Sequence, residues 1–142
     1  MARLTDLTSY ADAQAHASSA GMWDLFEGDR AEMNIAHECV LRHADGSGRA
    51  AIRIAHADGE DEIVSFDQLA AAASRFAHWL DAQRVAKGDR IAVMLAPSLP
   101  YYACIFGAIL QGAIAVPLFT LFGPDALRLR IGDCQPALVI TN

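Results

Sequence analysis

The sequence predicts an α/β fold in which a helix and a short β-hairpin precede a βαβαβ unit with a parallel sheet. Residues 91–124 contain no charged side chain, as expected of strands that are covered on both faces. Prolines and glycines divide this run into strand-length and helix-length pieces. A further strand-length segment, residues 138–141, follows one more helix. Strands that are separated by helices in this way are expected to pair in parallel.

The chain before the sheet divides into an arm and the start of a domain. Residues 1–21 are mostly small and polar, and we expect an arm with little helix. Residues 22–142 are expected to form part of a larger domain, because a hydrophobic content of 54% is high for a small domain with its own core. A helix is predicted over residues 34–43, where apolar residues recur at helical spacing and Asn34 can cap the first turn.

A β-hairpin is predicted next. Residues 49–55 and 62–65 are short strand candidates, and Asp58-Gly59 between them is a turn signal. The acidic residues of this connection could hold a cation, but clustered acids in a loop are more often a solvated turn. They are Asp58, Glu60, Asp61 and Glu62.

The clearest helix signal begins at Ser65. Ser65 and Gln68 have the spacing of a capping box. An apolar stripe on one face of the helix follows, formed by Leu69, Ala73, Phe76 and Leu80. Gly88 is available for a left-handed turn before the next strand.

The parallel unit then follows in order. Strands are expected at residues 91–95 and 114–118, with a helix between them that Ser98 caps and Gly112 closes. Pro124 suits the first turn of the last helix. Ligands of such sheets bind beyond the carboxyl ends of the strands, which places a site at residues 96–99, at residues 119–123 and beyond Asn142.

A membrane span is the alternative interpretation of the apolar run. Residues 99–122 are long enough to cross a hydrocarbon core of about 30 Å. However, Gly112 and Pro117 interrupt this segment, Gln111 lies inside it, and no cluster of Lys or Arg flanks one side. We therefore expect no membrane span.

Composition excludes several classes of partner and site. The formal net charge is −6, so the chain has no basic surface for nucleic acid, and no nucleic-acid partner is expected. Cys39, Cys104 and Cys134 are far apart in apolar or helical context, a reduced pattern that predicts a cytoplasmic protein. The N-terminal residues show no apolar signal segment.

The first strand-to-helix loop lacks the residues of the common nucleotide and nucleophile motifs. Residues 96–100 have no glycine to approach a pyrophosphate. Ser98 follows Pro97 and is not set in a G-x-S-x-G turn. Its expected role is a helix cap.

The cysteines and histidines are expected to pack rather than bind metal or catalyse. Cys39 and His43 could share one face of the predicted helix, but His37 points elsewhere and no second Cys/His pair has ligand spacing. Cys104 lies in an apolar helix and is expected to be inert. The residues alone therefore specify a parallel α/β unit with no catalytic constellation.

Several motifs, in order, resemble the N-terminal part of the AMP-forming acyl-CoA synthetases, in the superfamily of adenylate-forming enzymes. The first core motif of this family resembles Val64–Leu69, and its second core motif resembles Leu110–Leu118. Its Gly-Asp-Arg-Val strand is similar to Lys87–Val93. Ala31–Ala44 resembles the acetyl-, medium-chain and aryl-CoA ligase branch. The resemblance covers about Trp23 to Asn142.

The resemblance implies a two-step reaction. A carboxylic acid and ATP with Mg²⁺ give an acyl-adenylate and pyrophosphate, and the thiol of coenzyme A then displaces AMP. It also places the phosphate loop, the adenine- and ribose-binding motifs and the catalytic lysine after Asn142. We therefore expect a chain truncated before the phosphate loop, inactive alone and binding no cofactor tightly; no catalytic residue or metal ligand is assigned, and whether it is an enzyme stays open.

One site is carried over from the resemblance. In the acetyl-CoA synthetase-like branch, the segment after the second core motif helps to hold the nucleotide part of coenzyme A, and it aligns with Phe119, Thr120 and Leu121. This sequence has Thr120-Leu121 where acetyl-CoA synthetase has glycines, which disfavours a close backbone approach. A loop that only packs the next helix is the alternative.

A non-catalytic role is the second class of function. The chain could be an association module, or a truncated pseudogene product that pairs with a full-length synthetase. Uncovered apolar surface would also promote self-association. The sequence does not identify the carboxylic acid.

Overall fold

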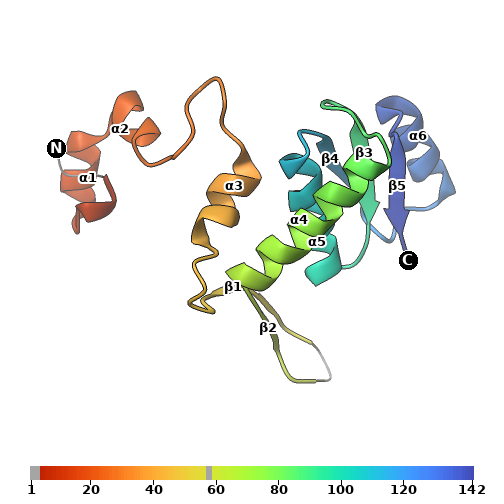
Figure 1. Ribbon diagram of the computed structural model, residues 1–142, viewed down its shortest axis with the longest axis horizontal. Helices are drawn as coiled ribbons and strands as arrows, with labels where there is room; N and C mark the ends of the chain where they lie inside the picture. Colours follow the sequence, from red (N-terminus) through yellow and green to blue (C-terminus); the bar gives the residue numbers. More distant parts are fainter. Residues whose placement is uncertain (1–3, 57–58) are drawn as a thin grey trace. The chain divides into compact units, whose positions relative to one another are not determined.

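The computed structural model describes residues 4–56 and 59–142 (Figure 1). These residues form two compact units, one ending at Met33 and the other running from Asn34 to Asn142.

The first unit contains more helix than the sequence predicted. It forms a 3₁₀ turn η1 (Leu4–Asp6) and two short helices, α1 (Tyr10–His16) and α2 (Ser19–Trp23), none with a buried residue. The expectation of little helix was wrong because serines cap both helices: the Ser9 hydroxyl accepts from the Asp12 N–H, and Ser18 accepts from Gly21.

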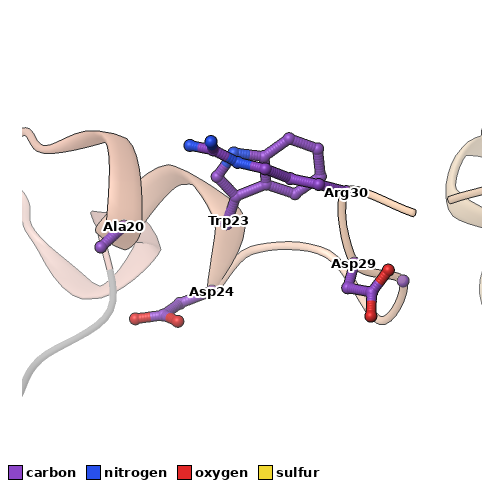
Figure 2. Close-up of a pocket in the computed structure, with 6 residues that line it drawn as sticks. Ala20, Trp23, Asp24, Asp29 and Arg30 are labelled. Atoms are coloured by element: carbon purple, nitrogen blue, oxygen red, sulfur yellow. The ribbon is translucent and has the colours of Figure 1, made fainter. Parts of the chain in front are cut away.

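Aromatic and charged side chains hold the C-terminal part of this unit. The Arg30 guanidinium lies 5.4 Å from the Trp23 ring centroid and donates to the Ser19 hydroxyl at 2.9 Å. Asp29 accepts hydrogen bonds from the backbone N–H groups of Ala31 and Glu32. Figure 2 shows Arg30 lying along the indole of Trp23. Both residues line a hollow of about 420 Å³.

The second unit begins with a broken helix. The sequence predicted one helix over 34–43, but the structure has α3 (Ile35–Cys39) and a 3₁₀ turn η2 (Leu41–His43), separated at Val40 with φ −129° and ψ −61°. The Asn34 cap is confirmed, since its side chain accepts from Ala36 at 2.9 Å. Its amide also donates to the carbonyl of Ile109 at 3.0 Å. Asn34 thereby ties α3 to the end of helix α5 (Leu99–Leu110).

The predicted hairpin is confirmed. Strands β1 (Ala50–Ile54) and β2 (Glu62–Ser65) pair antiparallel. Part of the predicted Asp58-Gly59 turn and of the acidic cluster lies outside the described residues, because Asp58 is among those not described. Of the cluster, Asp61 pairs with Arg53 at 3.3 Å.

Helix α4 (Phe66–Ala82) begins with the predicted capping box. The Ser65 hydroxyl accepts from the Gln68 N–H at 3.1 Å, and the Gln68 side chain accepts from the Ser65 N–H at 2.9 Å. The predicted stripe faces the core: Leu69, Ala73 and Leu80 are buried and Phe76 is half-buried. Gly88 has the expected positive φ, 89°.

The three-stranded sheet confirms the predicted parallel fold. Strand β3 (Arg90–Met94) lies in the centre and pairs in parallel with β4 (Ile114–Pro117) on one side and β5 (Leu138–Thr141) on the other. Helix α5 (Leu99–Leu110) connects β3 to β4, and α6 (Pro124–Cys134) connects β4 to β5. The apolar run thus divides into β3, α5 and β4. Across the described ranges, no helix is long and apolar enough to span a membrane.

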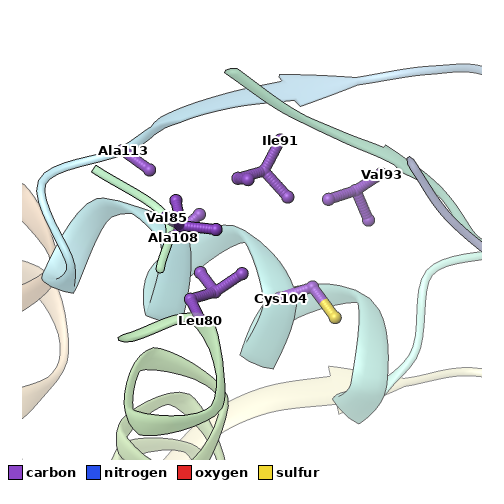
Figure 3. Close-up of a cluster of buried hydrophobic side chains, with 7 residues drawn as sticks. All are labelled: Leu80, Val85, Ile91, Val93, Cys104, Ala108 and Ala113. Atoms are coloured by element: carbon purple, nitrogen blue, oxygen red, sulfur yellow. The ribbon is translucent and has the colours of Figure 1, made fainter. Parts of the chain in front are cut away.

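The main core lies between the sheet and the helix pair α4 and α5. Figure 3 shows its buried side chains gathered beneath β3 and β4. They are Leu80, Val85, Ile91, Val93, Cys104, Ala108 and Ala113. Helices α4 and α5 cross closely at Gly107, where an added Cβ would lie 2.6 Å from the carbonyl oxygen of Ala73. The packing therefore requires a residue without a side chain at this crossing.

Arg90 fastens the end of α6 to the central strand. Its Nε donates to the carbonyl of Cys134 at 2.9 Å, and a terminal nitrogen donates to that of Gln135 at 3.0 Å. These carbonyls lie at the helix C-terminus, where a cation also complements the helix dipole.

The Gly107 crossing yields a stability prediction. Gly107→Ala is expected to lower the free energy of unfolding by about 1–3 kcal/mol, because the added methyl group overpacks the α4–α5 contact. Gly132→Ala is the matched control: nothing lies within 4 Å of a Cβ at this helical position, so it should be neutral or stabilising. Urea unfolding followed by circular dichroism measures both, and equal effects of the two changes would contradict the packing described.

Candidate functional site

The topology of the sheet creates one candidate site. The chain moves from β3 to its neighbour β4 and then back past β3 to β5. Two right-handed crossovers in opposite directions place their helices on opposite faces of the sheet, in agreement with the positions of α5 and α6 in Figure 1. The loops that leave β3 and β4 therefore diverge at the carboxyl ends of these strands. Such a switch point is where open parallel sheets bind ligands.

The loop after β4 carries the predicted site residues at this switch point. Leu118 is buried and donates its N–H to the carbonyl of Val93 at 2.8 Å, which fixes the start of the loop. The carbonyl of Phe119 accepts from the N–H of Phe122 at 3.1 Å. This bond turns the chain at Thr120 and Leu121. All three predicted residues are exposed, Phe119 by 59% and Leu121 by 79%.

Phe122 and Arg130 form aromatic and cation–π contacts next to this turn. The Phe122 ring packs edge-on against Phe119 with centroids 5.9 Å apart. The Arg130 guanidinium lies 4.0 Å from the centroid of the Phe122 ring, a cation–π distance. Arg128 pairs with Asp125 at 2.7 Å. Arg128 and Arg130, the two cations of α6, therefore already have partners, Asp125 and Phe122. Residues 118–123 themselves carry no charge.

The loop after β3 contributes backbone structure rather than a nucleophile. The Ser98 side chain accepts from the N–H of Tyr101 at 3.3 Å and donates to the carbonyl of Ala96 at 2.9 Å. These bonds confirm the predicted helix cap. Among the described residues, no histidine is a hydrogen-bond partner of Ser98.

The other candidate groups do not assemble into a site. His43 packs against the ring of Phe66 at 5.1 Å. Within the described ranges, no three His, Cys, Asp or Glu side chains lie together as a metal site requires. The hollow beside Trp23 is lined by Asp24, Asp29 and Arg30 (Figure 2). Arg30 already lies over the indole ring, and among the described residues that line the hollow there is no His, Cys, Ser or Lys.

A shallow apolar groove also lies on the second unit. It has a volume of about 440 Å³ and is lined by side chains of α3, β1, α4 and α5, including Ile52, Phe66 and Tyr102. Arg53 on its wall pairs with Asp61. The groove holds no pair of groups for acid–base or nucleophilic chemistry.

The parallel unit lies within a match to a known protein family. A family model described as AMP-binding enzyme matches residues 42–142. The chain belongs to this AMP-binding enzyme family. The match includes the whole sheet and both loops of the switch point.

Relatives of this AMP-binding chain are acyl-CoA synthetases. The acetyl-coenzyme A synthetase of Halorhodospira halophila is 35% identical over 128 residues, which are 84% of this chain and 20% of the relative. That of Leptospira biflexa is 33% identical over 98% of this chain and 21% of its own length. The crystal structure of the Brucella canis acyl-CoA synthetase superposes with a TM-score of 0.85 and 34% identity, over 96% of this chain and 25% of that one.

These similarities confirm the predicted family and fold class. The chain matches the N-terminal part of the adenylate-forming fold and spans about a fifth of the length of the curated relatives it matches. What the sequence did not reveal is the support of the loop by Phe122 and Arg130. Their contact depends on the angle at which α6 leaves the turn, and no local pattern encodes that angle.

Burial of Cys104 leads to a prediction about thiol reactivity. Cys104 is 7% exposed and its pKa is raised by burial, whereas Cys39 is exposed. A raised pKa leaves less thiolate at pH 8, so Cys104 should react with a disulfide reagent slower than Cys39 by about two orders of magnitude or more. Cys104→Ala should therefore leave the number of thiols that react in the native protein unchanged and lower by one the number that react in denaturant. Fast native modification at Cys104 would contradict its place in the core.

Proposed function

We propose that this chain forms the N-terminal part of an AMP-forming acyl-CoA synthetase. In the reaction, a carboxylate oxygen attacks the α-phosphate of ATP, held with Mg²⁺, and pyrophosphate leaves. The coenzyme A thiolate then attacks the acyl carbon, the bond to AMP breaks, and the acyl-CoA thioester forms. Family membership and relatives named acyl-CoA synthetases support this proposal.

The observation that carries the proposal is the exposed turn Phe119–Leu121 at the switch point. An exposed aromatic side chain can stack on a purine base, and the strand ends are where parallel sheets hold ligands. We propose that this turn contacts the nucleotide part of coenzyme A. The fit is partial, because the loop has no charge and the neighbouring Arg128 and Arg130 are already paired with Asp125 and Phe122. Phosphate groups would gain little here, so binding by these residues alone is weak.

The catalytic groups are proposed to lie outside these residues. No Gly-Lys-Ser/Thr loop and no nucleophile turn occurs in residues 1–142. In this proposal residues 1–21 are an arm, residues 22–142 are part of the AMP-binding domain, and ATP and Mg²⁺ are held elsewhere in the synthetase. The three separate free cysteines favour a cytoplasmic protein.

The proposal predicts where coenzyme A acts on the chain. In a titration followed by amide NMR, coenzyme A should shift the signals of residues 118–123, with a dissociation constant on the order of millimolar. Phe119→Ala should weaken this binding about tenfold, since stacking on one base contributes roughly 1–3 kcal/mol.

Leu129→Ala is the control for coenzyme A binding. Leu129 is also a large exposed apolar residue, 71% exposed, but it lies on α6 and outside the turn. Its replacement should leave the dissociation constant unchanged. Shifts that avoid residues 118–123, or an equal effect of the two substitutions, would refute the assigned contact.

A second prediction concerns activity. The 142-residue chain, supplied with acetate, ATP, Mg²⁺ and coenzyme A, is expected to release no pyrophosphate and to form no thioester. Pyrophosphate release and thiol consumption measure the two half-reactions separately. Carboxylate-dependent release of pyrophosphate by the purified chain would contradict the proposal that the ATP site and the catalytic groups lie outside residues 1–142.

A further inference from the structure

The side chain of Arg130 reaches the turn after β4 from the second half of α6. One of its terminal nitrogens donates to the carbonyl of Ala126, one helical turn earlier, at 3.1 Å. The side chain therefore runs back along the helix, in the direction in which helical side chains lean. This course brings the guanidinium to Phe122, the last residue before the helix cap at Gly123.

The Phe122 ring contacts both this guanidinium and Phe119. The guanidinium carbon lies 4.0 Å from the centroid of the Phe122 ring, where the electron-rich face attracts a cation. The Phe119 ring meets the Phe122 ring edge-on, with centroids 5.9 Å apart and an angle of 73° between the planes. An edge-on pair is a favourable arrangement of two aromatic rings. Arg130 is thus joined to Phe119 through the ring of Phe122.

The position of the Phe119 ring depends on these ring contacts. Phe119 is 59% exposed, whereas Phe122 is half-buried. An exposed side chain samples several rotamers, and fixing one of them on binding costs free energy. A ring that is already held before the ligand arrives avoids most of this cost. A residue that holds the ring can therefore raise the affinity without touching the ligand.

We propose that Arg130 is a positioning residue: it holds the Phe122 ring, which in turn holds Phe119 in one orientation. As a statement about ligand binding, the inference rests on the proposed contact between this turn and the nucleotide part of coenzyme A. Arg130 then strengthens that contact through Phe119, and it does so without pairing with a phosphate group.

Arg128 is the matched comparison for Arg130. Both arginines lie on α6, so the same substitution removes the same charge from the same helix. The Arg128 guanidinium pairs with Asp125 at 2.7 Å, and both side chains of this pair are exposed. An exposed ion pair of this kind contributes little to stability. Replacing Arg128 therefore changes the charge beside the turn and leaves the contact between Arg130 and Phe122 in place.

NMR of the ligand-free chain tests the positioning itself. Arg130→Gln removes the cation and keeps a good helix former. It should weaken the cross-relaxation between the rings of Phe119 and Phe122 about twofold or more, and lower the heteronuclear NOE of the amides of residues 119–122. Arg128→Gln should leave both measurements unchanged. Arg130→Lys should give intermediate values, because an ammonium group also attracts a ring face but cannot stack on it.

Circular dichroism checks that each variant keeps its fold. Ring contacts that are unchanged in Arg130→Gln, or an equal loss in the two glutamine variants, would overturn the proposal.

A coenzyme A titration separates positioning from a direct contact with the ligand. Arg130→Gln should raise the dissociation constant about threefold. In a chain that already carries Phe119→Ala, the same change should have no further effect, because residues that act through one group are not additive. Equal weakening in both backgrounds would mean that Arg130 binds phosphate directly, and it would overturn the proposal.

The two sets of measurements fail separately. If coenzyme A shifts no signal of residues 118–123 in the wild-type chain, the proposed coenzyme A contact is refuted. The ligand-free measurements still decide whether Arg130 positions Phe119, because they involve no ligand.

Discussion

The burial of one strand on both faces is the constraint on which the rest of the second unit depends. Ile91, Ala92 and Val93 are fully buried, which requires helices on both sides of β3 and neighbours along both edges. On one side the cover is a close pair of helices, α4 and α5, whose contact at Gly107 leaves no room for a side chain. On the other side α6 is fastened by Arg90 from β3 itself. This arrangement fixes the positions of the loops that follow β3 and β4.

Features encoded locally could be predicted from the sequence. The capping box at Ser65 and the caps at Asn34 and Ser98 depend on neighbouring residues, and the structure confirms them. The break at Val40 was not predicted, because the apolar spacing of residues 34–43 is the same whether or not the helix is continuous. The helices of the first unit were missed because the serines that cap them, at positions 9 and 18, were read only as polar residues.

Features that depend on spatial order could not be predicted in the same way. The sequence predicted a ligand site at the carboxyl ends of the strands, but not that β3 lies between β4 and β5. That order creates the divergence of the two loops and gives Phe119, Thr120 and Leu121 their exposed position. The candidate site therefore combines a loop that sequence analysis could name with a geometry that only the sheet provides. It has no titratable group, so its chemistry is limited to contact and stacking.

Native-state hydrogen exchange tests the central claim most directly, because it measures the protection of each backbone amide. The account predicts that the amides of Ile91, Ala92 and Val93 exchange only through global unfolding, while those of Thr120 and Leu121 exchange orders of magnitude faster, since local openings have a much lower free energy in exposed turns. Exchange of the β3 amides at rates close to those of the turn would contradict the account, because β3 would then not be the buried centre that positions the site.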